Sequence, residues 1–197
     1  INIDNAACND INWTGVTNNP TFNYNSKQLK ITGSYILNQN MSVNNDYTDF
    51  NGTSTSTLDT RGVSLRGIYV NGATVSLASP LYTSNSLYLN SGTFISNNHP
   101  IRTYRLSSYV TQNATMTIDL GTSTLTIDYT LNLADIGYSG SYGDLIMDNA
   151  SSTVIFGGDY WHDYSENYWE RVIIDNTTSN RSTHRFYDHG DFGRITS

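Results

Sequence analysis

Basic residues are scarce in this sequence, and their scarcity excludes several classes of partner. Lysine occurs only at Lys27 and Lys30, and the formal net charge is −7. Because no basic stripe is present to neutralise phosphates, we expect no nucleic-acid partner, and an anionic membrane surface would repel the chain. No apolar run is long enough to span a bilayer, so we also expect no direct membrane insertion.

Cysteine is nearly absent as well. Cys8 is the only one, so no internal disulfide can form, and we interpret Cys8 as a small core residue. The sequence shows no signal peptide and does not begin with Met, which leads us to expect a fragment of a mature or longer protein.

Low charge does not indicate disorder in this case. Charged residues make up 14% of the chain and hydrophobic residues 37%, while tyrosine alone occurs 15 times. Disordered chains combine low hydrophobicity with high charge and few aromatic residues. This chain instead has low charge and many aromatic residues. We therefore expect a folded domain, and the length of 197 residues is sufficient for a sizeable core.

Short alternating apolar runs replace helical periodicity throughout the chain. No sustained spacing of three and four residues between apolar positions is found, and strong helix formers are few. Asn, Asp, Gly and Ser separate the runs, which is typical of strands joined by turns. The predicted strands include residues 29–31, 68–70, 87–89, 125–127, 154–156 and 172–174.

A repeated template indicates the fold. An apolar strand, a polar turn and a Thr followed by an apolar residue recur at 68–75, 87–94 and 118–125, and more loosely at 147–154. The template threonines are Thr74, Thr93, Thr124 and Thr153, so the interval between successive copies is irregular. This spacing predicts an all-β, right-handed parallel β-helix (a solenoid) with irregular rungs of about 19–31 residues and protruding loops. A β-sandwich, which also contains many short strands, is the alternative fold.

The template also predicts which side chains face inward and which face outward. We expect residues 1–197 to form a single β-helix domain, in which 176–197 is a terminal rung or capping segment. If the apolar residue after each template threonine points inward, the four threonines form one outward column. Such a flat threonine array would suit an ice-binding solenoid, a minor alternative to ordinary strand surface. The expected core residues are Val70, Val75, Leu77, Leu89, Phe94, Leu120, Leu125, Ile127, Met147, Val154 and Phe156.

Several segments resemble a known kind of protein. Residues 8–22, 87–94 and 117–127 are similar to Ser/Thr/Asn-rich repeat regions of large bacterial secreted and cell-surface proteins, such as adhesin-like proteins and extracellular fibres. The resemblance covers roughly residues 1–175, and the last twenty or so residues depart from it. It implies a parallel β-helix and a secreted or cell-surface location, and it implies no catalytic residues.

The densest aromatic segment, residues 159–170, is the candidate ligand site. Aromatic faces stack on sugar rings, and neighbouring Asp, Glu and Asn side chains bind their hydroxyls. The candidate glycan-binding residues are Tyr160, Trp161, Tyr164, Tyr168 and Trp169. The alternative is a long loop between rungs whose aromatic side chains fold back over the flank of the solenoid.

Metal binding and catalysis have weaker support. In the His/Asp-rich segment 184–191, Asp188, His189 and Asp191 offer ligands, but they do not complete a calcium or zinc pattern, so we predict no metal and no cofactor. Acid–base catalysis needs two groups held close together, whereas Asp119 and Asp128 fall on different predicted strands.

The two basic residues in the loop that follows Pro100, Arg102 and Arg105, have no acidic cluster nearby in sequence. We therefore expect a non-catalytic structural or adhesive module. The alternative is a carbohydrate-binding or polysaccharide-processing β-helix. The expected partners are a glycan or another cell-surface ligand, and neighbouring domains or end-to-end copies of the same chain, because bare solenoid ends need covering.

Overall fold

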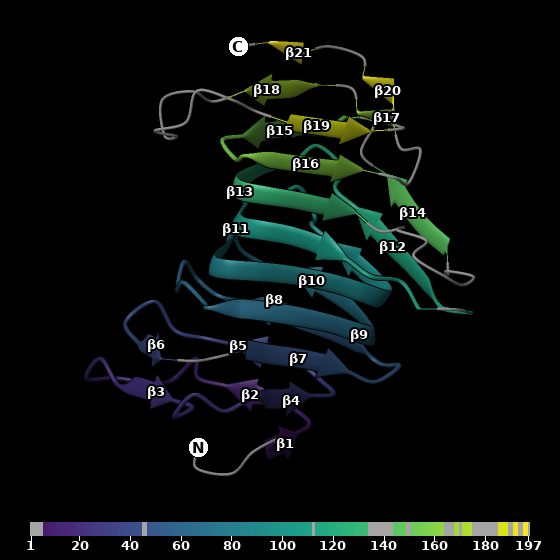
Figure 1. Ribbon diagram of the computed structural model, residues 1–197. Helices are drawn as coiled ribbons and strands as arrows, with labels where there is room; N and C mark the ends of the chain where they lie inside the picture. The colour runs from purple at the N-terminus through teal and green to yellow at the C-terminus, as the bar shows by residue number, and fades with distance from the viewer. Residues whose placement is uncertain are drawn as a thin grey trace.

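The strands of this chain stack into a parallel β-helix of about seven turns (Figure 1). The computed structural model describes residues 6–44, 47–111, 113–133, 144–148, 151–163, 168–169, 171–174, 185–188, 191–192 and 195–196. These ranges contain strands and turns and no helix. The predicted all-β fold and its parallel stacking are therefore confirmed.

Each rung runs through three faces, which we call the first, second and third face. The first face contains β1 (Ala6–Cys8), β4 (Leu29–Ile31), β7 (Tyr47–Asn51), β16 (Tyr160–Asp163), β19 (Arg185–Asp188), the start of β9 (Gly67–Leu77), the middle of β10 (Leu81–Ile95) and the ends of β11 (Ile101–Ser108) and β13 (Thr124–Leu133). The second face contains β2 (Ile11–Asn12), β5 (Tyr35–Ile36), β8 (Thr55–Asp59), β12 (Thr115–Asp119), β14 (Asp144–Asp148) and the ends of β9 and β10. The third face contains β15 (Thr153–Phe156), β18 (Val172–Ile174), β21 (Ile195–Thr196) and the starts of β10, β11 and β13.

Two further strand pairs stand apart from this stack. β3 (Thr21–Asn23) pairs with β6 (Ser42–Asn44), and β17 (Tyr168–Trp169) pairs with β20 (Asp191–Phe192). Every strand pairing in the described ranges is parallel, which rules out the antiparallel β-sandwich alternative there.

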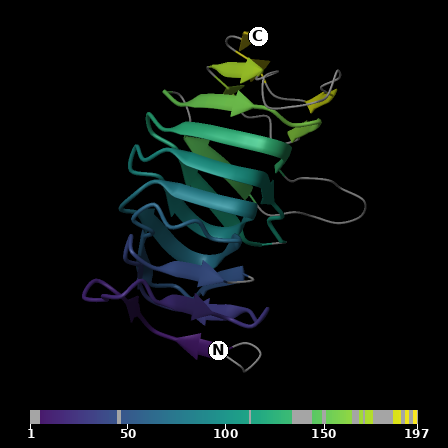
Figure 2. The same ribbon diagram turned by 90° about the vertical axis from the view of Figure 1, so that its left-hand side faces the viewer.

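Successive rungs stack strand above strand, as the view turned by 90° shows (Figure 2), and equivalent residues are therefore paired between rungs. On the first face, Leu87 pairs with Leu106 of the next rung. Higher in the same face, Leu131 pairs with Trp161, across a much longer stretch of sequence. Rung length therefore varies widely while the column is kept, as the sequence predicts, because the extra residues lie outside the paired strands.

The core forms a continuous column between the faces. Ten of the eleven predicted core residues are buried, and the exception, Met147, is partly buried and packs against the core. Phe94 and Val75 are neighbours in one inward column of the second face, and both are fully buried. One rung cannot bury such side chains by itself, so burial depends on stacking.

Glycine forms the corner between the first and second faces. Gly72 and Gly92 both have φ of +97°, a conformation that side chains with a Cβ rarely adopt. A Cβ on Gly92 would also collide with the carbonyl oxygen of Ala73 in the rung below. At the same corner the side-chain amide of Asn90 donates to Asn71 (3.1 Å), which donates in turn to the Asp49 carboxylate (2.6 Å). These side-chain hydrogen bonds form a polar ladder between rungs.

The predicted single column of four threonines is wrong. Thr74 and Thr93 pair on the second face, whereas Thr124 and Thr153 pair on the third. The strand–turn–threonine template occurs at two different corners of a rung, so its later copies are not equivalent to its earlier ones. The second-face column instead extends Thr74 and Thr93 with Thr55 below and Thr117 above.

Candidate functional site

The predicted glycan residues do not form one exposed platform in this structure. Trp161 is fully buried, and its ring packs edge-on against Phe156 with the centroids 5.3 Å apart. A buried ring offers no face to a sugar, so Trp161 belongs to the core. Tyr160 is half-buried on the outside of β16, and β17 contains Tyr168 and Trp169. Tyr164 lies outside the described residues.

The His/Asp-rich segment is only partly described. Asp188 ends β19 and Asp191 begins β20, whereas His189 lies outside the described residues. In the ranges that the structure describes, no three His, Cys, Asp or Glu side chains gather as a metal site. The same ranges contain no helix that is long and apolar enough to cross a membrane.

The two carboxylates considered for catalysis, Asp119 and Asp128, lie on different strands, and each has a structural contact. Asp119, on the second face, accepts a hydrogen bond from the Gly121 N–H (3.0 Å) and thereby stabilises a turn. Asp128 lies in β13 and forms an ion pair with Arg102 (3.0 Å). The guanidinium of Arg105 lies against the rings of Tyr104 and Tyr129.

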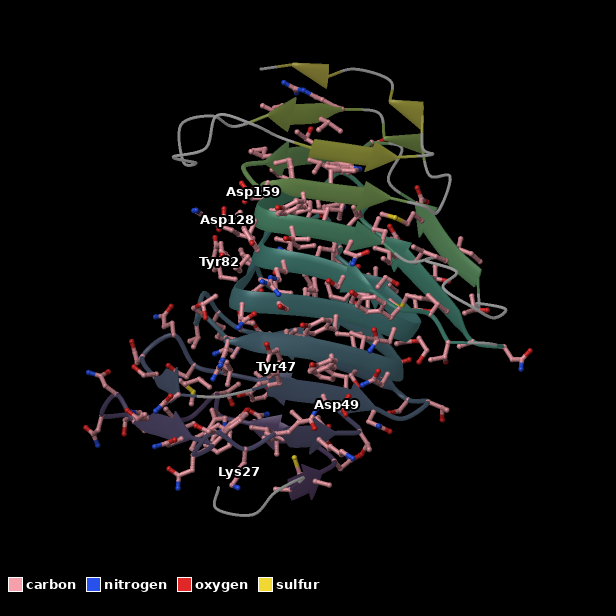
Figure 3. All side chains as sticks on the ribbon, viewed as in Figure 1. Lys27, Tyr47, Asp49, Tyr82, Asp128 and Asp159 are labelled. Carbon is pink, nitrogen blue, oxygen red and sulfur yellow. The ribbon has the colours of Figure 1, made fainter. Side chains whose placement is uncertain are left out.

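Exposed and half-buried tyrosines form the main feature of the first face. In its lower rungs Tyr69 and Tyr88 are paired neighbours whose rings stack with centroids 4.5 Å apart and planes 8° apart. Tyr47 lies 5.1 Å from Tyr69 and 6.0 Å from Tyr88. Figure 3 shows Tyr47 on the sheet that faces the viewer.

A second group of tyrosines lies in the upper rungs, where Tyr104 and Tyr129 occupy the corner between the third and first faces and Tyr160 begins β16. Tyr104 stacks on Tyr129 with centroids 4.8 Å apart and planes 10° apart, and Tyr129 meets the edge of Tyr160 at 6.5 Å. The Arg105 guanidinium lies 5.8 Å from the Tyr104 ring and 5.1 Å from the Tyr129 ring. We call the two groups together the tyrosine strip: Tyr47, Tyr69, Tyr88, Tyr104, Tyr129 and Tyr160.

Local packing explains why the strip forms. Tyr47 lies across Gly67, where the absence of a side chain leaves room for its ring. Arg66, next to this glycine, places its guanidinium 5.9 Å from the Tyr47 ring. Cations over tyrosine rings contribute about 0.5–1 kcal/mol at exposed sites. Arg66 and Arg105 therefore help to hold the tyrosine rings in place.

The sequence contains a signal for this strip that the template search missed. Tyr69 and Tyr88 are partners in successive rungs, so the interval between them in the sequence is one rung length at that point. The later tyrosines are out of register with this pair, because the partner of Tyr88 in the next rung is Ser107 and the partner of Ser107 is Asn132. The aromatic residues of segment 159–170 are close together in the sequence and are therefore easy to notice. The residues of the tyrosine strip are far apart in the sequence.

A hollow opens at the lower end of the strip. Its volume is about 390 Å³, and it lies between β6 and the turn that precedes β9. It is lined by Val43, Asn44, Ser64, Leu65, Arg66 and Ser84. Polar side chains therefore surround an opening that has two apolar residues at its wall.

Burial perturbs a few groups near the N-terminal end of the stack. The Tyr24 and Tyr35 hydroxyls lie 2.7 Å apart in the core. Burial is the main cause that raises the pKa of Tyr24 to about 12 and the pKa of Tyr35 well above its usual value. Cys8 is half-buried against the core, as predicted, and burial followed by the nearby Asp10 charge raises the pKa of its thiol.

The fold and the strip define the class of this protein as a parallel β-solenoid with an aromatic outer surface. No protein-family model, curated protein sequence or solved structure matches the chain. The functional argument therefore depends on the residues described above.

Proposed function

We propose that this chain is a non-catalytic structural and adhesive module of an exported surface protein or extracellular fibre, and that its tyrosine strip contacts glycans on a cell surface. The tyrosine strip carries the proposal. Tyrosine combines an apolar ring with a hydroxyl at low conformational cost, and tyrosine and arginine are enriched where proteins bind partners.

The solenoid supports this role because it is a stiff, repetitive spacer. Rungs stacked about 4.8 Å apart present their outward side chains at regular intervals. A sugar unit in an extended glycan has a similar length, so a chain lying along the stack meets the tyrosines of one group rung by rung. Weak individual contacts then add up along the polymer.

Ice binding is less well supported by the surface chemistry. The second-face column of Thr55, Thr74, Thr93 and Thr117 is regular. The outward column next to it contains Thr57, Ser76, Ile95 and Asp119, which mixes hydroxyl, aliphatic and acidic side chains. An ordered water lattice needs both columns to be regular, so we do not propose this function. The predicted end-to-end association or neighbouring domains stay a prediction.

Two equally exposed tyrosines provide a matched test of the adhesive surface. Tyr104 belongs to the strip and Tyr82 lies on the third face, and both are 38% exposed. We expect the wild-type chain to bind members of a glycan array, and Tyr104→Ala to weaken that binding about tenfold, which is about 1.4 kcal/mol. Tyr82→Ala should leave the binding unchanged. Equal losses in the two variants, or no binding by the wild type, would contradict the proposal.

A further inference from the structure

Arg105 lies on the outer surface of the first face, beside the upper group of tyrosines. It pairs with Ser86 in the rung below and with Thr130 in the rung above. Leu106, the next residue in the strand, is buried, so the alternation of the strand directs Arg105 outward, and its side chain is exposed. Because serine and threonine are short, they leave room for the arginine side chain to lie along the neighbouring rings.

Two tyrosine rings hold the guanidinium of Arg105. The rings of Tyr104 and Tyr129 stack with centroids 4.8 Å apart, and the guanidinium carbon lies 5.8 Å from the first centroid and 5.1 Å from the second. A guanidinium in contact with aromatic rings keeps N–H donors at its edge, and its planar fork matches the two oxygens of a carboxylate. The rings order this group before a ligand arrives, which lowers the entropic cost of binding.

This fork has no carboxylate partner in the part of the chain that the structure describes. Arg102, in the same strand, forms an ion pair with Asp128 (3.0 Å). Arg105 forms no ion pair with any described residue. A guanidinium has five donors and no acceptor, so an anion from outside the chain is the group that suits it.

The two carboxylates that lie next to these tyrosines in the sequence do not face a ligand. Asp128, which precedes Tyr129, is neutralised by its ion pair, and Asp159, which precedes Tyr160, is only 7% exposed. The net charge of −7 belongs to the whole chain, and charges more than about 8 Å away are largely screened at physiological ionic strength. Arg105 therefore supplies the exposed charge beside these rings.

We propose that the upper tyrosine group binds an acidic sugar, whose carboxylate pairs with Arg105 while its ring lies against the tyrosines. The apolar C–H face of the sugar contacts the ring of Tyr104, which is 38% exposed, and its hydroxyls bond to the tyrosine hydroxyls. The ligand class is a sugar with a carboxylate, either a uronic acid within a chain or a sialic acid at the end of one. This inference rests on the glycan-binding role proposed above and adds the chemical class of the glycan.

The test compares sugars that differ in charge. A glucuronate oligomer and the glucose oligomer of the same linkage and length form one pair, and a sialylated oligosaccharide and its desialylated form make the second pair. Each is titrated into the whole chain in a calorimeter. We expect the wild type to bind the acidic member of one pair about tenfold more tightly than the neutral member, because hydrogen bonds to charged groups are the stronger ones. The pair that shows the preference identifies the source of the carboxylate.

Two arginine variants separate a local contact from the net charge of the chain. Arg105→Gln should remove the preference, so that the acidic and the neutral sugar bind equally. Arg61→Gln removes the same charge from an exposed side chain in the turn after β8, at the corner between the second and third faces. It should keep the preference of the wild type.

The outcomes distinguish this inference from the proposed function. A preference that survives in Arg105→Gln, or that both variants lose equally, would overturn the acidic-sugar site. If the wild type binds the neutral sugars as tightly as the acidic ones, the acidic-sugar site is wrong and the glycan-binding role of the tyrosine strip is kept. If the wild type binds none of the four sugars at millimolar concentration, both proposals are wrong.

Discussion

Tyr24 and Tyr35 bring two phenol hydroxyls into the apolar core of the lower rungs. Each is fully buried, and their oxygens lie 2.7 Å apart, so each hydroxyl has a hydrogen-bond partner. A buried neutral pair of this kind is inexpensive, whereas a phenolate in the same place would lose its hydration. Burial therefore raises the pKa of both groups, and for Tyr24 the value moves from 10.0 to about 12.

The raised pKa values predict unfolding in alkali. In the unfolded chain these phenols ionise near their usual pKa, while the folded chain keeps them protonated, so their contribution to stability is complete below pH 10. It decreases as the pH rises from about 10 to about 12. Circular dichroism against pH should show that the double variant Tyr24→Phe with Tyr35→Phe unfolds at higher pH than the wild type. Tyr109→Phe, at a residue that is 51% exposed, should not shift the transition. An unchanged midpoint in the double variant would contradict the assignment.

At the scale of single elements, β16 shows how an aromatic strand divides its roles. Its Tyr160 lies outside, whereas the ring of Trp161 fills the core next to Phe156. We expect Trp161→Ala to reduce the free energy of unfolding by about 3–5 kcal/mol, because it leaves a large cavity. Urea unfolding measures the change, and Trp161→Phe, which refills part of the space, should cost less. A loss of less than about 1 kcal/mol for Trp161→Ala would contradict the buried position.

Some properties of these elements follow from local sequence and others do not. The six runs predicted as strands all lie in strands, because alternation of apolar and polar residues is a local property. The inward position of Trp161 cannot be predicted from the local sequence. Aromatic or charged residues occupy both the odd-numbered and the even-numbered positions of 159–163, so either set could face the core. Likewise Thr124 and Thr93 have the same local pattern but lie on different faces, because the face depends on how many residues the preceding loops contain.

At the scale of the whole molecule, the rungs act as interchangeable layers. Ser86 pairs with Arg105 on the first face, so removing residues 87–105 and joining Ser86 to Leu106 shortens the chain by one rung in register. Leu106 would then stack on Ile68, because both are partners of Leu87. The other two faces rejoin in the same way, with Ile118 above Val75 and Leu125 above Leu81.

We therefore expect the chain without residues 87–105 to fold. Stability in a solenoid is approximately a sum over rungs and their interfaces, so loss of one of about seven turns should lower the urea m-value by roughly a seventh. The matched control removes only residues 87–96, which takes one strand from each of the first and second faces and leaves the third-face strand 101–103 and its neighbours in the chain. That chain should lose its cooperative unfolding transition, because the first-face and second-face ladders each lack one strand. If both deletions unfold equally in circular dichroism and urea titration, the rungs are not exchangeable units, and the stack must depend on contacts specific to each layer.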